Sequence, residues 1–149
     1  MKLAAVQFPH EGNHAEIEGQ IRRMFARYGP TFVDLAIGAR ADMPALLEFY
    51  SAPLRFIGDA FHMVMRDESA LLGADGMGGE IARLRSAGFA GSALEKCDIK
   101  VLNQQAAAVD ALWLRRDSSG AVMSRFAVLY LVALTPAGWR ITSAVNTAG

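Results

Sequence analysis

Apolar residues recur every three or four positions from residue 17 to residue 37, which is the spacing of an amphipathic helix. Asn13 precedes this segment and is a candidate N-cap. The Gly29-Pro30 pair predicts a break or a kink, because proline lacks the amide hydrogen that a helix interior uses. Gly38 predicts the end of the segment.

The pattern changes to strands after Pro53. Asp42 is a candidate cap for a second, short helix before that point, and Gly58-Asp59 is a hairpin-type turn. We expect strands at 54–57 and 61–65, a glycine-weakened helix within 69–88, and four further strands at 93–102, 106–116, 121–134 and 139–146. Helices, a strand pair, a helix and a long antiparallel meander together predict an α+β fold.

The strand predicted at 121–134 is apolar without alternation over residues 126–134, which indicates that both faces of the sheet are covered. Turns at 117–120 and 135–138 place Asp110 opposite Ala127 and Leu134 opposite Trp139. This geometry predicts a core face with Val109, Ala111, Trp113, Phe126, Val128, Tyr130, Val132, Leu134, Trp139, Ile141 and Val145. The outer face is predicted to carry Asp110, Leu112, Leu114, Met123, Arg125, Ala127, Leu129, Leu131, Arg140, Thr142 and Asn146. Because three helices cover only one face, we expect a homodimer that packs through the outer sheet face.

Composition and charge narrow the class of protein. Lys+Arg and Asp+Glu are balanced at 15 each, so we expect no nucleic acid as a partner. The single cysteine, Cys97, excludes an intrachain disulfide and is typical of a reducing compartment. The longest apolar run, 126–134, is too short to span a membrane. We therefore predict a cytoplasmic protein without membrane attachment, with an N-terminal tail at 1–12 and one domain at 13–149.

Two short motifs resemble binding sites. Residues 10–14, His-Glu-Gly-Asn-His, match the zinc motif H-E-x-x-H, but the helix is predicted to begin only at Asn13. The glycines of 73–79 resemble a phosphate loop without its Lys-Ser/Thr and with Glu80 in its place. We therefore predict neither a metal site nor a cofactor, and we interpret the glycines as a loosely wound helix whose backbone approaches the sheet closely.

Two residues are candidates for acid–base chemistry. Asp110 lies in an almost wholly apolar strand, where a carboxyl group either has a raised pKa or finds a partner. Arg125 is predicted to lie diagonal to Asp110 across the hairpin, so we expect an ion pair between them at the subunit interface. The alternative is that Asp110 is a poised acid or base in a pocket. His62, predicted opposite Arg55, is either a pocket base or a hydrogen-bonded wall residue.

Three segments carry a resemblance to a known superfamily: MPALLEFYSAPLRFIG at 43–58, GGEIARL at 78–84 and GWRI at 138–141. The chain resembles the nuclear transport factor 2-like (NTF2-like) superfamily from about residue 14 to residue 146, with SnoaL-like polyketide cyclases and ketosteroid isomerases among its branches. The resemblance implies a curved antiparallel sheet wrapped around N-terminal helices as a cone with an internal cavity, often as a dimer. Tyr28, Asp59 and Asp110 are the nearest analogues of the isomerase residues, but their spacing differs and no catalytic role is carried over.

Three functions remain open on this basis. The first is binding of a small apolar molecule in the cone. The second is an enzyme of the isomerase, dehydratase or cyclase type, with His62 or Asp110 as general base. The third is a dimerisation or protein-interaction module. The ligand-binding candidates are Tyr28, Tyr50, Arg55, His62, Trp113, Tyr130 and Trp139.

Overall fold

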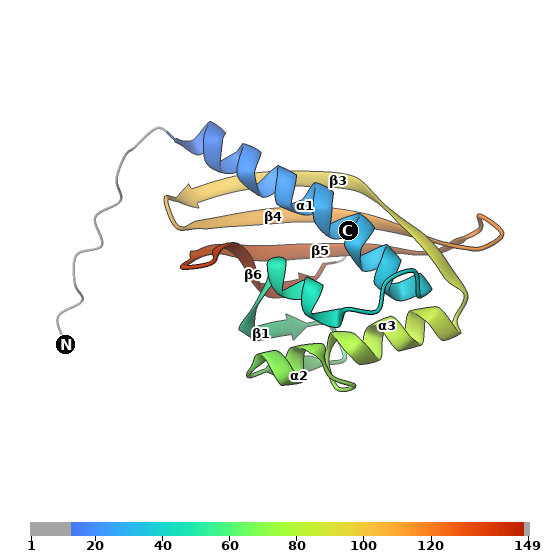
Figure 1. Cartoon of the computed structure of the whole chain (residues 1–149). Helices are drawn as coiled ribbons and strands as arrows, with labels where there is room; N and C mark the ends of the chain where they lie inside the picture. The colour runs from blue at the N-terminus through green and yellow to red at the C-terminus, as the bar shows by residue number, and fades with distance from the viewer. Residues whose placement is uncertain (1–12, 148–149) are drawn as a thin grey trace.

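Six strands form one curved, open sheet in the order β2-β1-β6-β5-β4-β3, and the helices lie on one of its faces (Figure 1). The computed structural model describes residues 13–147. The strands are β1 (Tyr50–Ile57), β2 (His62–Met65), β3 (Phe89–Asn103), β4 (Ala106–Asp117), β5 (Val122–Thr135) and β6 (Gly138–Asn146). The helices are α1 (His14–Ile37), the 3-10 helix η1 (Met43–Glu48), α2 (Glu68–Leu72) and α3 (Met77–Ser86). The predicted α+β class is confirmed, and the order of elements is as predicted except that two helices, α2 and α3, stand where one was expected.

The sheet is antiparallel except where β1 runs parallel to β6. Side chains alternate between an inner face, which packs against α1, and an outer face, which carries no helix in the described part of the chain. Buried side chains of α1 and of the inner face form the core together with those of η1, α2 and α3. The core of the described residues therefore lies on the inner side of the sheet.

The first helix continues through Pro30, where a break or a kink was predicted. Tyr28 and Phe32 are buried on either side of the proline, and both belong to the same core cluster. Packing on both sides offsets the cost of a proline in a helix interior, about 3 kcal/mol. The prediction for Gly38 is confirmed, since it ends α1 with φ 82°. Asn13 precedes α1 but makes no side-chain capping hydrogen bond.

The predicted third helix is two helices, because the chain turns sharply at Gly73–Gly76. A Cβ atom on Gly76 or Gly79 would collide with a backbone carbonyl oxygen, that of Ala70 or that of Ala74. The glycines therefore allow close backbone approach, as predicted, but the approach is between α3 and the segment that precedes it rather than the sheet.

Three strand registers differ from the predicted ones. In the β1–β2 hairpin Arg55 pairs with Val64 rather than with His62, and in the β4–β5 hairpin Asp110 pairs with Leu129 rather than with Ala127. Both are shifts by two residues, which keep every side chain on its face. In β6 an irregularity between the Val132 and Leu131 pairings shifts the register by one residue.

This one-residue shift reverses the predicted faces at the end of β6. Val145 pairs with Leu129 on the outer face, and the buried side chain at this point is Ala144. The prediction that Val145 belongs to the core is therefore wrong. Leu134 pairs with Trp139 as predicted, but it is exposed at the end of the strand rather than buried.

None of the helices within residues 13–147 combines the length and the apolar character that crossing a bilayer requires. The predicted N-terminal tail and the first three residues of the H-E-x-x-H match lie outside the described residues, and both interpretations stay predictions.

Candidate functional site

An inner cavity of about 50 Å³ lies between α1 and the inner face of the sheet. Helix α1 contributes residues of its buried face, and strands β4 and β5 contribute alternate residues, which point toward the helix. The lining is mostly aromatic and consists of Tyr28, Gly29, Phe32, Tyr50, Phe56, Met77, Glu80, Ser92, Trp113, Arg115, Phe126 and Tyr130.

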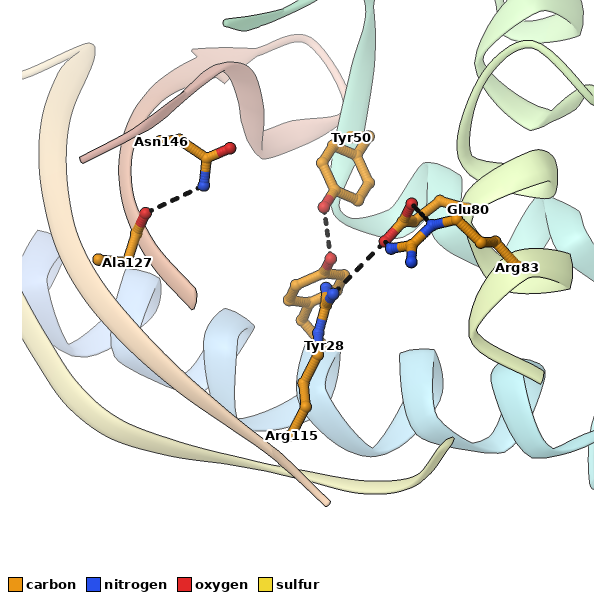
Figure 2. Close-up of polar contacts among 7 residues, drawn as sticks. All are labelled: Tyr28, Tyr50, Glu80, Arg83, Arg115, Ala127 and Asn146. Carbon is orange, nitrogen blue, oxygen red and sulfur yellow. Dashed lines mark hydrogen bonds and ion pairs between the residues drawn. The ribbon is translucent and has the colours of Figure 1, made fainter. Parts of the chain in front are cut away.

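All three tyrosines of the protein contribute to this lining. The hydroxyl groups of Tyr28 on α1 and Tyr50 on β1 are hydrogen-bonded to each other, as Figure 2 shows. The hydroxyl of Tyr130 accepts a hydrogen bond of 2.9 Å from the indole Nε1–H of Trp113. The three tyrosine hydroxyls are thus each hydrogen-bonded to another side chain of the cavity wall.

Burial keeps these tyrosines in their neutral form. Loss of solvent raises the pKa of Tyr28 to about 12, against an opposing effect of the hydrogen bond with Tyr50 and of the charge of Arg115. The pKa of Tyr50 is also raised well above its usual value by burial, then by the neighbouring Tyr28 and Tyr130. Burial likewise raises the pKa of Tyr130. All three side chains therefore keep their hydroxyl protons at neutral pH, and each is able to donate as well as to accept a hydrogen bond.

A charged group of three side chains lies beside the tyrosines (Figure 2). Arg83 binds both carboxylate oxygens of Glu80, with distances of 2.6 Å from Nη2 to Oε1 and 3.1 Å from Nε to Oε2. Arg115 reaches the same carboxylate at 3.4 Å through Nη1. The Arg115 guanidinium also lies 4.7 Å from the ring centroid of Phe126 and 6.0 Å from that of Phe32. Arg115 is thus held chiefly by aromatic rings.

A wider groove of about 470 Å³ adjoins the inner cavity. Phe56, Met77 and Glu80 line both spaces, so the two meet along a shared wall. The rest of the groove comes from β1–β2 and from the α2–α3 region, with Phe61, Met63, Met65, Ala74, Asp75, Gly76, Gly79 and Arg83. The groove is in the size range of small-molecule sites, whereas the inner cavity has room for one small group.

Four of the seven predicted ligand-binding residues line the inner cavity: Tyr28, Tyr50, Trp113 and Tyr130. Trp139 on β6 is buried in the core but does not line the cavity, and its indole Nε1–H donates to Gln20 of α1 at 2.9 Å. Arg55 and His62 lie on the outer face, both exposed, with Arg55 Nη1 and His62 Nε2 3.0 Å apart. The predicted contact between Arg55 and His62 therefore exists, but away from the cavity.

The predicted ion pair between Asp110 and Arg125 is wrong. Asp110 binds Lys96 Nζ at 2.8 Å on the outer face, and Arg125 binds Glu95 at 2.5 Å. The two-residue register shift places Arg125 opposite Leu114 and moves it away from Asp110. Asp110 is paired at the surface and does not line the cavity.

Sequence reasoning missed Arg115 and Glu80, the charged residues of the cavity wall. The alternation of β4 carries a signal for Arg115, since it lies two residues after Trp113 and therefore on the same face. In the structure the buried Leu54 lies on the inner face of β1, and its neighbour Arg55 lies on the outer face. Glu80 had no such signal, because the direction of α3 depends on the turn before it.

The fold and the site together define the class of protein: an α+β cone with a cavity lined by aromatic residues. A family model described as NTF2-like protein (DUF6841) matches residues 15–149, and the chain belongs to this family. No curated protein matches the chain.

Solved structures of the same fold agree with this assignment. An NTF2-like protein with a cystatin-like fold from Novosphingobium aromaticivorans is 24% identical, with a TM-score of 0.68 over 89% of this chain and 81% of that one. An NTF2-like superfamily protein from Salmonella enterica is 16% identical, with a TM-score of 0.62 over 89% and 91%. A candidate ketosteroid isomerase from Shewanella frigidimarina is 13% identical, with a TM-score of 0.59 over 87% and 93%. At these identities the likeness supports the predicted NTF2-like fold and no particular activity.

Proposed function

We propose that this protein binds a small, largely apolar molecule in the groove and the inner cavity. The observation that carries the proposal is that the two spaces lie next to each other and share Phe56, Met77 and Glu80 in their walls. An apolar concave site with a few fixed polar groups is the general form of a small-molecule site. The body of the ligand occupies the groove, and one polar group enters the inner cavity beside the tyrosines.

Binding is better supported than the enzymatic alternative. Acid–base catalysis in the cone was expected to use His62 or Asp110, and both lie on the outer face. Among the described residues, the inner cavity is lined by one carboxylate, that of Glu80, and by no histidine. The Glu80 carboxylate is already engaged by two guanidinium groups of the protein, those of Arg83 and Arg115.

We further propose a homodimer through the outer face. Leu129 and Leu131 in the middle of the sheet are 40% and 41% exposed, and Val64 on β2 is 44% exposed. Ile57 and Val145 lie beside Leu129 in the same row across the sheet. The simplest way to cover an apolar sheet face of this kind is to pack it against the same face of a second copy of the chain, related by a two-fold axis. We place the protein in the cytoplasm, since its only cysteine, Cys97, is a free thiol.

The two tryptophans provide a direct test of ligand binding. The indole N–H of Trp113 belongs to the cavity wall, whereas that of Trp139 is bonded to Gln20 elsewhere. Titration of ¹⁵N-labelled protein with neutral aromatic amides, benzamide and 2-naphthamide, is expected to shift the Trp113 indole signal and to leave the Trp139 signal in place. Substitution of each tryptophan by Phe assigns the two signals.

A pair of neighbouring variants supplies the control. Ser92 lines the cavity, and Ala93 is exposed on the opposite face of the same strand. Ser92→Leu fills the cavity and is expected to abolish the Trp113 shift, whereas Ala93→Leu is expected to retain it. A Trp113 signal that neither amide moves, or that moves equally in both variants, contradicts the proposal.

A further inference from the structure

The geometry points to a small apolar acid as the ligand: its carboxylate binds Arg115 and the tyrosine hydroxyls in the inner cavity. This inference rests on the proposed binding function and specifies the chemical class of the ligand. It depends on three features of the cavity wall, namely the charge balance at Arg115, the donors around it and the small size of the inner cavity.

The positive charge of Arg115 is only partly compensated. The Arg115 side chain is 13% exposed, and its one hydrogen-bond partner in the described part of the chain is Glu80, at 3.4 Å. Glu80 is bound more closely by Arg83, at 2.6 Å and 3.1 Å. Two guanidinium groups thus share one carboxylate, which leaves one net positive charge at the cavity wall. Asp75, the other carboxylate along the groove, is exposed.

The neighbouring polar groups add hydrogen-bond donors. Tyr130 accepts from Trp113, which leaves its own hydroxyl proton without an assigned acceptor among residues 13–147. In the pair formed by Tyr28 and Tyr50, one hydroxyl proton makes the mutual bond and the other is left over. A cavity that offers a guanidinium and two hydroxyl protons matches a group with oxygen acceptors and a negative charge.

The sizes of the two spaces indicate which end of such a ligand each one holds. An inner cavity of about 50 Å³ has room for a carboxylate but not for a ring system. The groove of about 470 Å³, with Phe56, Phe61 and Met63 in its wall, has room for an apolar body of one or two rings. The planar guanidinium of Arg115 also suits a carboxylate better than a lysine ammonium would, since it presents paired donors in one plane.

Two probes of the same shape test the inference. 2-Naphthoate carries a carboxylate at neutral pH, and 2-naphthamide carries a neutral carboxamide in its place. We expect the unmodified protein to bind naphthoate at least about tenfold more tightly, as a charge-assisted hydrogen bond allows. Dissociation constants come from calorimetry, and the Trp113 indole signal reports whether each probe reaches the cavity. Equal affinity for the two probes overturns the inference.

Substitutions assign the preference to Arg115. Arg115→Gln is expected to remove the naphthoate preference and to leave naphthamide binding within about threefold, whereas Arg116→Gln on the opposite face keeps the preference. Arg115→Lys, which retains the charge, is expected to keep part of it, and its circular dichroism spectrum shows whether the fold survives. Glu80→Gln removes the competing carboxylate and is expected to increase the preference.

The outcomes separate this inference from the proposed function. If naphthamide shifts the Trp113 signal but naphthoate binds no better, or if Arg115→Gln weakens both probes equally, the ligand is not an acid while the binding function stands. If neither probe reaches Trp113, the proposed function fails and the inference fails with it. A weaker naphthoate preference in Glu80→Gln also contradicts the role given to Arg115.

Discussion

Tyr28 and Tyr50 hydrogen-bond to each other inside the cavity, although they lie 22 positions apart in the chain, one on α1 and the other at the start of β1. Both side chains are buried, where a polar group requires a hydrogen-bond partner, and each hydroxyl has the other as its partner. The bond therefore joins the helix layer to the sheet at the place where a ligand is proposed to bind.

Removal of one hydroxyl from this pair is expected to destabilise the fold. Tyr50→Phe leaves the Tyr28 hydroxyl buried without its partner, at a cost of about 1–3 kcal/mol in the free energy of unfolding. Urea denaturation followed by circular dichroism measures this cost.

The double variant Tyr28→Phe/Tyr50→Phe provides the control for that measurement. It removes both hydroxyls at once and is expected to cost less than the sum of the two single variants, because no unpaired hydroxyl remains. Additive costs would show that the two hydroxyls do not interact.

Stability is expected to decrease at alkaline pH. Burial raises the pKa of Tyr28 to about 12 and that of Tyr50 and Tyr130 well above the usual value. The folded protein therefore keeps protons that unfolded tyrosines release near pH 10, about their unperturbed pKa. The stabilisation is fully present below pH ~10 and is lost as the pH rises toward about 12, by up to about 1.4 kcal/mol per pH unit for each tyrosine.

Phenolate absorbance measures this directly, because all three tyrosines of the protein line the cavity. The native protein is expected to show no phenolate signal near pH 10–11, whereas the chain in urea titrates with a midpoint near pH 10. A native midpoint at pH 10 would contradict the burial of these side chains.

The order of elements was readable from the sequence because periodicity and turn residues are local signals, as the hairpin turns around Gly58 and Gly138 illustrate. Strand faces were predicted correctly where the register differed by two residues, as at Asp110, since such a shift preserves the alternation. They were wrong where it differed by one, as at Val145, since a bulge in β6 depends on packing that no local pattern records.

The candidate site was predictable only in part, for the same reason. Tyr28, Trp113 and Tyr130 belong to long, regular elements, whose periodicity assigns them to the core side. Arg55 and His62 belong to a short hairpin, whose inner face is defined by the neighbouring strand β6. That neighbour is far away in the sequence, so residue spacing alone does not show which face of the hairpin belongs to the inner face of the sheet.

The close approach of α3 to the segment before it predicts a strict requirement for glycine at position 79. Gly79→Ala places a methyl group against the carbonyl oxygen of Ala74, and we expect a loss of about 1–3 kcal/mol in the free energy of unfolding. Gly91→Ala is the matched control, because nothing lies within 4 Å of the added Cβ, and a change within about 0.5 kcal/mol is expected. Thermal and urea denaturation measure both. A tolerated Gly79→Ala would contradict the tight turn that places Glu80 in the cavity wall.

The proposed dimer predicts a difference between two leucines of the same strand. Leu131 faces outward in the middle of the sheet, whereas Leu134, three residues later, lies on the opposite face near the end of β5. Their exposed fractions are similar, 41% and 45%.

Light scattering at micromolar concentration is expected to give twice the 16.0 kDa chain mass for the unmodified protein and for Leu134→Lys. Leu131→Lys is expected to give the mass of one chain, because each buried leucine contributes about 1.5–3 kcal/mol and a two-fold axis counts the loss twice. A monomeric mass for the unmodified protein, or a dimer that survives Leu131→Lys unchanged, would show that another body covers the outer face.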